Sequence, residues 1–373
     1  MLIAVTALAI TLPAATAAAA SSHQSGREQH LQAALDAIVA GGSPGAILLD
    51  RHNGRTIRLA SGYADVAVAA RMRVTDRFRA ASQMKSFTAT VVLQLVQEHR
   101  LRLEDRVDRL LPGVLPASYP YRSDLTVRHL LQNNSGLFDF GDDPRVLAPY
   151  LAGDLGHVWT PQQLLDIAFE HPPLFPPGTR FNYSDTGYFL AAYIVEAVTD
   201  HRFAAELSRR ILRPLGLRGT DLPTTGDIWG RHAHGYIALG DPPVDTDITY
   251  LYPFAWAAGG INTTADDSAR FYRALFGGRL LGPGMMREMK KTIEVTDSDL
   301  PSRSGLGVQR WTPCGVAWGH SGNSPGYLVY TWISPDTRHE TVLLMNDDPQ
   351  NAPLEPAAFA AYSELLNRSF CDR

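Results

Sequence analysis

A serine and a lysine three positions apart are the first residues whose types and spacing could do chemistry. Ser82 and Lys85 stand in the stretch ASQMKSF at residues 81–87, which opens a long apolar run. Residues three apart share one face of a helix, so the hydroxyl and the ammonium would be neighbours. Burial lowers the pKa of a lysine, and such a lysine can activate a serine nucleophile. The same spacing also arises by chance in long proteins, so the pair needs further support.

Two later segments carry groups that a serine nucleophile needs. Residues 181–188 read FNYSDTGY, and Tyr183 is a candidate proton shuttle if a nearby cation lowers its pKa. Residues 318–326 read WGHSGNSPG, in a predicted strand whose glycines would let a ligand backbone approach closely. Each segment alone is a weak signal, because a Tyr-x-Asp loop and a His-Ser-Gly strand are often purely structural.

Taken together and in this order, the three segments resemble the serine beta-lactamase and penicillin-binding-protein superfamily. The resemblance runs from about Gln29 to Cys371 and looks closest to the class C-like branch, especially the secreted actinobacterial D-alanyl-D-alanine carboxypeptidases. TVRHLL at 126–131 and AWAAGGI at 255–261 support it. It implies a serine hydrolase that works through an acyl-enzyme and needs no cofactor.

The resemblance assigns a catalytic role to four residues. Ser82 would be the nucleophile, and Lys85 would take part in proton transfer. Tyr183 would act as general base in acylation and later protonate the leaving group. His320 stands where many relatives have the lysine of Lys-Thr-Gly.

Substrate contacts are implied by position in the same motifs. Ser321 would donate its hydroxyl to a substrate carboxylate, and the backbone N–H groups of Ser82 and Asn323 would form the oxyanion hole. Trp256 would line the acyl pocket or, equally, be an ordinary core tryptophan. The carboxypeptidase branch also presents a cation to the substrate carboxylate from the preceding strand. Arg310 is the nearest candidate, with Gln309 and Arg303 as alternatives, and without such a cation the case for carboxypeptidase over esterase weakens.

One departure from the family pattern lies beside the catalytic tyrosine. The middle motif usually ends in asparagine, but this chain has Asp185. Its carboxylate would pair with Lys85, hold the lysine protonated and shift base work onto Tyr183; alternatively it only accepts hydrogen bonds. The usual His-Thr before Ser-Gly-Leu is replaced by Asn133-Asn134, which we interpret as a structural exchange.

D-Ala-D-Ala carboxypeptidase activity on peptidoglycan-type peptides is therefore the leading expectation for function. An esterase, a D-amino-acid amidase and a beta-lactamase are alternatives within the same fold. A penicillin-binding or peptide-binding module without activity is the non-enzyme alternative, and the intact Ser82, Lys85 and Tyr183 set argues against it. Small peptides, esters or beta-lactams are the expected partners, and we expect a monomer.

Composition and charge narrow the class of protein. The 373 residues are 45% hydrophobic and 19% charged, which is ordinary for a globular chain. The net charge is −4 and no run of basic residues occurs, which argues against nucleic acid as a partner. His232-Ala233-His234 is a weak metal signal, because the sequence shows no third ligand; we expect no metal.

The first twenty residues and the two cysteines bear on localisation. Residues 1–20 are uncharged and become rich in small residues, which predicts a signal peptide too short to span a membrane. A hydrophobic N-terminal helix of the fold is the alternative. Cys314 and Cys371 would form a disulfide in an exported protein. We therefore expect a secreted protein.

Predicted strands lie near both ends of the chain and predicted helices lie in the middle. Helical spacing covers 29–40, 161–170, 186–199 and 356–368, a short helix is predicted within 98–111, and a strand at 305–311. His52-Asn53-Gly54 predicts a hairpin turn. The pattern predicts an α+β fold, with an antiparallel sheet flanked by the first and last helices and an inserted helical lobe. Residues 21–373 would form one catalytic domain, with an α/β lobe at about 29–81 and 256–373 and a helical lobe at about 82–255.

Overall fold

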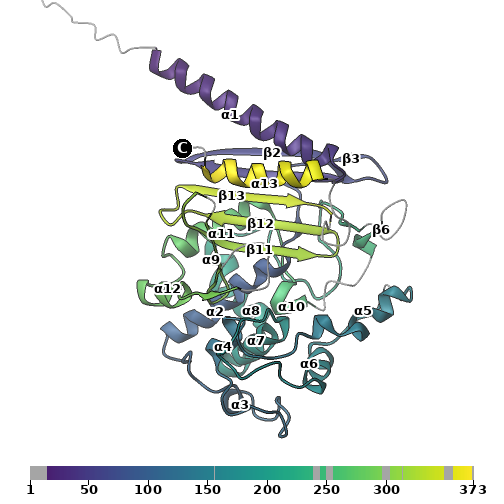
Figure 1. Ribbon diagram of the computed structural model, residues 1–373, viewed down its shortest axis with the longest axis vertical. Helices are drawn as coiled ribbons and strands as arrows, with labels where there is room; N and C mark the ends of the chain where they lie inside the picture. The colour runs from purple at the N-terminus through teal and green to yellow at the C-terminus, as the bar shows by residue number, and fades with distance from the viewer. Residues whose placement is uncertain are drawn as a thin grey trace, which may run out of the picture.

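A large antiparallel sheet is the centre of the structure, a computed structural model that describes residues 15–154, 156–237, 244–248, 255–295, 303–312, 314–347 and 356–371. Two helices cover one face of this sheet, and most of the remaining helices lie below it in the view of Figure 1. This arrangement confirms the predicted α+β class. The predicted boundaries of the two lobes stay a prediction.

Within the described residues the sheet has nine strands, and every adjacent pair is antiparallel. The order across the sheet is β3 (Ala70–Arg71), β2 (Arg55–Asp65), β1 (Gly45–His52), β13 (His339–Met345), β12 (Tyr327–Ile333), β11 (Ala317–Ser324), β10 (Gln309–Trp311), β9 (Arg303–Ser304) and β8 (Ile293–Glu294). The first strand, β1, thus lies inside the sheet, and the last strand, β13, pairs directly with it.

The β1–β2 hairpin follows from its turn residues. Asn53 and Gly54 take φ values of 49° and 84°, as a two-residue turn with both central residues left-handed requires. His52 then pairs with Arg55, and the predicted hairpin is confirmed.

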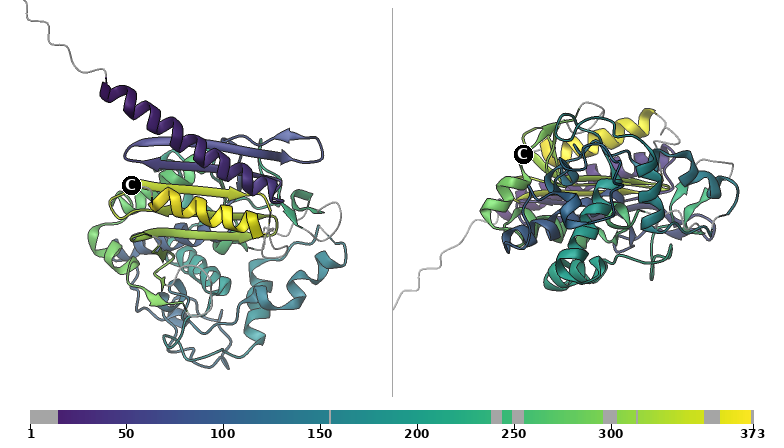
Figure 2. Two further views of the ribbon diagram at one scale, coloured as in Figure 1. Left: turned by 45° about the horizontal axis from the view of Figure 1, so that its top comes forward. Right: turned by 90° about the horizontal axis from the view of Figure 1, so that it is seen from below.

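Helices α1 (Ala15–Ala40) and α13 (Pro356–Cys371) lie side by side on one face of the sheet (Figure 2). Leu35, Ile38 and Leu365 of these helices are fully buried, and they share one apolar cluster with strand residues such as Trp332. The disulfide Cys314–Cys371 ties the end of α13 to the segment before β11, as expected.

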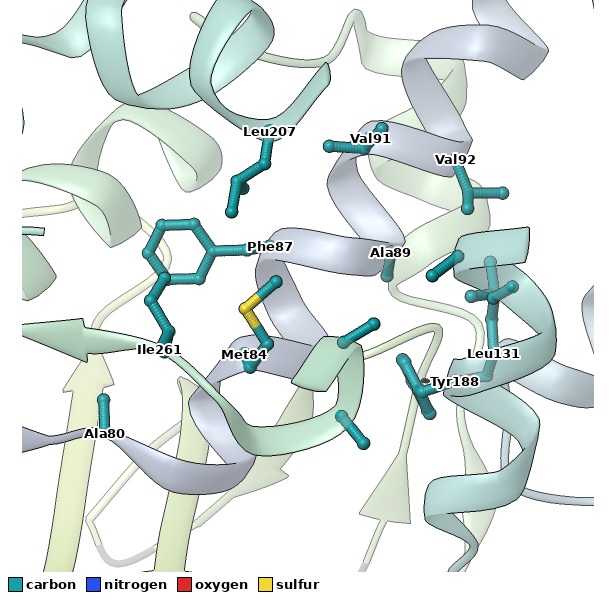
Figure 3. Packing of buried hydrophobic residues seen from close by; sticks show 14 of the residues in the cluster. Ala80, Met84, Phe87, Ala89, Val91, Val92, Leu131, Tyr188, Leu207 and Ile261 are labelled. Atoms are coloured by element: carbon teal, nitrogen blue, oxygen red, sulfur yellow. Dashed lines mark hydrogen bonds between the residues drawn. The ribbon is translucent and has the colours of Figure 1, made fainter. Parts of the chain in front are cut away.

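The other face packs on α11 (Ala265–Phe276), and α2 (Met84–Gln97) lies beneath it. Phe87 of α2 stacks on Phe271 of α11 with ring centroids 3.6 Å apart. Figure 3 shows Met84, Phe87 and Val91 among apolar residues contributed by other elements of the same core. The helix that follows Ser82 is therefore buried on nearly all sides, as its apolar run predicts.

The helical part surrounds α2 and carries the second motif. Its helices are α3 (Val107–Leu110), α4 (Val127–Leu131), α5 (Pro144–Leu151), α6 (Pro161–Glu170), α7 (Asp185–Thr199), α8 (Phe203–Leu207) and α9 (Arg213–Leu215), followed along the chain by α10 (Trp256–Gly259) and α12 (Pro283–Met289). Thr126 and Thr160 cap α4 and α6 through capping boxes, where the sequence predicts these helices to begin.

The short helix predicted within 98–111 is confirmed as α3, and α2 before it ends at Gln97, since His99 takes a left-handed φ of 58° that stops helix propagation. One predicted element is wrong in extent. The predicted strand at 305–311 is interrupted by Gly307, whose φ is 71° and whose Cα lies against the backbone of Lys85. This glycine brings the loop between β9 and β10 onto α2.

The predicted signal peptide at 1–20 lies mostly outside the described residues and stays a prediction. The predicted helix at 29–40 is confirmed and begins earlier, at Ala15. Within the described residues, none of the helices combines the length and apolar character that crossing a bilayer requires.

Candidate active site

Ser82 lies in a single 3-10 turn, η1 (Ala81–Gln83), that leads directly into α2. Ala81 before it has a φ of 50°, an uncommon and strained conformation for alanine that fixes the direction of the serine. Gly322 of β11 lies directly against this turn, because a Cβ there would come within 2.2 Å of the Ala80 carbonyl oxygen. The glycine of His-Ser-Gly thus accommodates the serine turn, rather than a ligand backbone as the sequence suggested.

Lys85 lies one turn further along, and its ammonium has three acceptors. Its Nζ donates to Ser82 Oγ at 3.2 Å, to the Ala258 carbonyl oxygen at 2.9 Å and to Asp185 Oδ1 at 2.5 Å. The side chain is completely buried. Three acceptors match the three protons of an ammonium, so the geometry favours charged lysine.

Asp185 at the start of α7 decides the charge of this lysine. Burial acts to lower the pKa of Lys85, but the carboxylate of Asp185, together with Tyr183, outweighs it and raises the pKa above the ordinary value. The lowered pKa expected from burial alone is therefore wrong. The alternative that a carboxylate at 185 holds the lysine protonated agrees with the structure.

Tyr183 reaches the same serine from the loop before α7. Its hydroxyl lies 2.5 Å from Ser82 Oγ, and the Lys85 ammonium lies 4.5 Å from the centre of its ring. Burial raises the pKa of Tyr183, and the nearby Lys85 opposes this rise without cancelling it. The resting tyrosine is thus a neutral phenol, not the ionised group that a neighbouring cation alone would favour.

His320 lies in a buried position on β11, near the charge of Lys85. Only 3% of its surface is exposed, and its Nδ1 donates to the Ser321 carbonyl oxygen at 2.5 Å. Burial, reinforced by the charge of Lys85, lowers the pKa of His320 to about 3. The imidazole is therefore neutral, with its proton on Nδ1.

The side-chain amide of Gln309, from the neighbouring strand β10, contacts Ser321 at the edge of β11. Gln309 Oε1 accepts hydrogen bonds from the Ser321 backbone N–H at 2.9 Å and from its hydroxyl at 3.1 Å. Arg310 pairs with Trp318, so its side chain lies on the opposite face of the sheet from that of Gln309. Arg303 donates instead to Thr292. Of the three candidates, Gln309 is thus the one in contact with Ser321, and the carboxylate-binding role of Arg310 stays a prediction.

The two remaining predicted substrate residues are Asn323, on the strand beside Ser82, and Trp256, in an aromatic cluster. Asn323 lies near the end of β11, opposite Leu328, on the strand that packs against the Ser82 turn. Trp256 of α10 packs edge-on against Phe189, Tyr193 and Phe203, and so has the contacts of a core tryptophan.

Three polar residues hold the site together, and only Asn133 among them was named from the sequence, in a structural role. Asn133 accepts from the Asn182 backbone N–H through its carbonyl and from the Ser184 N–H through Oδ1, so it fixes both sides of Tyr183. Its left-handed φ of 54° is what aims both oxygens. The asparagine in place of the usual histidine was the available signal.

The other two residues, which the sequence analysis did not single out, are Asp139 and Gln83. Asp139 Oδ2 accepts from the Asp185 backbone N–H at 3.0 Å, and burial together with the charge of Asp185 raises the pKa of Asp139 to about 7. Gln83 donates to the His320 carbonyl oxygen and to Thr331, which ties the serine turn to β11 and β12. Neither position has a sequence pattern that marks it.

The assembled geometry is a serine with a lysine and a tyrosine both in hydrogen-bonding reach, beside a strand that carries His-Ser-Gly-Asn. The family model described as "Beta-lactamase" matches residues 28–364. The chain belongs to the beta-lactamase family. Members of this family are serine hydrolases, and the predicted resemblance to the superfamily is confirmed.

Curated relatives in the family include penicillin-binding proteins. The chain is 25% identical over 321 residues to penicillin-binding protein 4* of Bacillus subtilis, covering 82% of this chain and 68% of that one. It is 27% identical over 299 residues to penicillin-binding protein 4 of Amycolatopsis lactamdurans, covering 78% and 72% of the two chains.

Solved structures of the same fold include two amide hydrolases. A D-stereospecific amidohydrolase from Streptomyces sp. superimposes with a TM-score of 0.83 at 31% identity, covering 93% of this chain and 99% of that one. The D-amino acid amidase of Ochrobactrum anthropi SV3, in complex with L-phenylalanine amide, gives a TM-score of 0.80 at 28% identity, covering 91% and 96%.

Proposed function

We propose that this protein hydrolyses amides of D-amino acids through an acyl-enzyme on Ser82. The observation that carries the choice is Gln309. A carboxypeptidase of this branch is expected to offer a cation to the terminal carboxylate of its substrate, whereas Ser321 here contacts an uncharged amide. A substrate whose scissile group ends in –NH2 carries no such carboxylate, and an amide side chain can both donate to and accept from it. The likeness to two D-specific amide hydrolases supports the same choice.

The acylation step uses Ser82 and Tyr183. In one concerted exchange, Ser82 Oγ attacks the carbonyl carbon of the substrate, its proton passes to the Tyr183 oxygen 2.5 Å away, and the phenol gives its own proton to the substrate nitrogen. The C–N bond then breaks, so ammonia departs and Ser82 carries the acyl ester. Water then attacks the ester by the same route in reverse, which releases the D-amino acid and restores both hydroxyl groups.

Lys85, Asp185 and His320 set the electrostatics of that exchange. The Lys85 ammonium, held by Asp185, contributes a positive charge beside Ser82 Oγ as negative charge develops there. Because His320 is neutral, it adds no second charge to the site. The backbone N–H groups of Ser82 and Asn323 are the proposed oxyanion donors.

D-Ala-D-Ala carboxypeptidase activity is the second candidate function. It is supported by the two relatives named penicillin-binding proteins. Export after removal of a signal peptide belongs to this proposal too, since the disulfide fits an oxidising compartment.

A panel of five substrates separates the candidates: D-phenylalanine amide, L-phenylalanine amide, a D-Ala-D-Ala peptide, a p-nitrophenyl ester and a chromogenic cephalosporin. We expect the highest kcat/KM for the D-amide, low turnover of its L enantiomer, and loss of roughly 10³-fold or more in Ser82→Ala. Turnover of the D-Ala-D-Ala peptide alone would select the carboxypeptidase. Activity on the ester alone would exclude both, and an acyl adduct mapped by mass spectrometry to a residue other than Ser82 would overturn the mechanism.

A further inference from the structure

Two histidines and an aspartate outside the catalytic group converge on one point. His232 Nε2 lies 2.5 Å and His234 Nε2 lies 3.6 Å from the same atom, Asp247 Oδ2. One ligand atom from each of the three residues falls within 4.8 Å of the others. The two imidazole rings stack with centroids 5.0 Å apart and interplanar angle 7°. The sequence offered only His-x-His, and the fold supplies the missing third ligand from fifteen residues downstream.

The other nitrogen of each ring is already held by an acceptor. His232 Nδ1 donates to the Gly230 carbonyl oxygen at 2.7 Å, and His234 Nδ1 donates to Asp245 Oδ2 at 2.8 Å. With Nδ1 held behind each ring, Nε2 is the nitrogen that faces Asp247, and a metal ion would take the place of the proton that His232 Nε2 now donates to Asp247 Oδ2. A backbone carbonyl and a carboxylate are the partners that metal-binding histidines commonly have behind them.

The third ligand is oriented in the same way. Asp247 Oδ1 accepts from the Tyr327 hydroxyl at 3.3 Å, which leaves Oδ2 directed at the two imidazoles. Asp65 Oδ2 lies 3.9 Å from His234 Nε2 and is a possible fourth ligand. All of these side chains are partly exposed, between 15% and 27% for the two histidines, Asp65, Asp245 and Asp247, so an ion has a way in.

We propose that His232, His234 and Asp247 bind one divalent transition-metal ion of the zinc class, with Asp65 or water in the fourth position. Nitrogen and carboxylate ligands in this number suit tetrahedral zinc. Bonds of about 2 Å in a tetrahedron separate the ligand atoms by roughly 3.3 Å. The present separations of 2.5 and 3.6 Å bracket that value, so small side-chain movements are enough.

The position of the cluster indicates a structural ion rather than a reacting one. Its loop bonds to three distant parts of the chain: the Ala233 backbone N–H donates to the Arg77 carbonyl, the His234 N–H to that of Ala64, and the Tyr327 hydroxyl to that of Ala233. Arg77 precedes the nucleophile turn, and Tyr327 follows the β11 strand. A bound ion would therefore fasten the chain on both sides of the site without entering it.

Metal binding is measured on full-length protein without a histidine tag, stripped with a chelator and then titrated with Zn²⁺. We expect one tightly bound zinc per chain by mass spectrometry of metals, and a higher Tm on loading, because an ion that binds only the folded state stabilises it. Co²⁺ in place of Zn²⁺ should give the intense visible absorption of a tetrahedral site.

Three variants and a control assign the ion to this cluster. His234→Ala and Asp247→Asn should lose the stoichiometric zinc and the Tm shift, and Asp245→Asn, which removes only the carboxylate behind His234, should weaken binding about 10- to 100-fold. His52→Ala changes a second adjacent histidine pair, His52 and His339, whose ring centroids lie 4.1 Å apart; it should leave binding unchanged. Absence of stoichiometric zinc in the wild-type protein overturns the proposal. Zinc binding by His234→Ala equal to that of the wild type, or loss of zinc binding in His52→Ala, also overturns it. The result is independent of which amide or peptide the enzyme hydrolyses.

Discussion

The Lys85 ammonium lies 2.5 Å from the Asp185 carboxylate, and the lysine side chain of this pair is completely buried. Relatives with the usual motif are expected to offer an amide at this position, so the pair is a feature of this chain. It means that the lysine beside the nucleophile is charged before substrate arrives. Tyr183, whose hydroxyl donates to Ser82 Oγ, is therefore the group left to exchange a proton with the nucleophile.

Replacing Asp185 by asparagine should change the protonation of Lys85. Burial then acts on the lysine without the carboxylate, so the pKa of Lys85 should fall from its raised value. We expect the pH profile of kcat/KM to gain a lysine titration that the wild-type profile lacks below pH 10. Asp142→Asn, an exposed neighbour, is the matched control, and identical profiles for Asp185→Asn and wild type would contradict the assignment.

Gln309 is predicted to determine which leaving group the enzyme accepts. Gln309→Arg adds a cation beside Ser321, and a charge-assisted hydrogen bond contributes about 1.5–3 kcal/mol. We therefore expect the ratio of kcat/KM for a D-Ala-D-Ala peptide to that for a D-amide to rise by roughly 10-fold or more. Gln309→Glu should move the ratio in the other direction. A ratio that responds to neither variant would mean that the substrate end lies elsewhere.

His320 should make the protein less stable in acid. Its pKa is about 3 when folded against an ordinary 6.5, so the unfolded chain binds the extra proton between these values. The contribution is fully present above pH 6.5 and is lost as the pH falls toward 3. Between pH 7.5 and 5 we expect a loss of about 2 kcal/mol that His320→Gln lacks. Urea unfolding of both proteins at the two pH values measures it, and parallel losses would rule out this origin.

Gly322 should not tolerate a side chain. A Cβ at this position would lie 2.2 Å from the Ala80 carbonyl oxygen, which belongs to the backbone and cannot rotate away. Gly322→Ala is therefore expected to move the Ser82 turn away from β11 and lower kcat by about 100-fold, since small displacements of a reacting group have costs of that size. Gly315→Ala, with open space around it, controls for glycine substitution in the same region, although its own φ of 140° adds some strain. Near-normal kcat in Gly322→Ala would show that the turn can adapt.

The disulfide should contribute substantially to stability. It closes a loop whose ends are 57 residues apart, for which the chain-entropy estimate is about 3–4 kcal/mol. We expect the double variant Cys314→Ser/Cys371→Ser to lose roughly that free energy of unfolding while keeping its activity, because the bridge lies at the end of α13 and away from Ser82. Peptide mapping without reductant is the companion measurement, and two free thiols in exported protein would refute the pairing.

Local patterns predicted the fold and the three chemical segments because their causes are local. Thr126 and Thr160 mark helix starts, Asn53-Gly54 marks a hairpin, and the apolar run after Ser82 marks a buried helix. What the sequence could not show were contacts made across the fold. The choice of Gln309 over Arg310 depends on which face of β10 each side chain takes, and one residue of register reverses it.

The charge state of Lys85 shows the same limit. Burial and a neighbouring carboxylate shift its pKa in opposite directions, and only the 2.5 Å contact to Asp185 reveals which one prevails. The sequence also could not identify Asp247 as a partner of His232, because their contact depends on the fold of the loop between them. In both cases the decisive contact joins residues that are distant in sequence, and only the fold shows how close they lie.

The pairing of β1 with β13 has a consequence for how the protein is made. Residues 45–52 lie in the middle of the sheet but find their partner only at 339–345. Until residues 339–345 have been made, β1 lacks the strand that pairs with it on that edge. Pairings this distant in sequence slow folding and leave apolar surface exposed in partly folded states. We therefore expect the sheet to be completed only late in folding, once the last strand has joined the first.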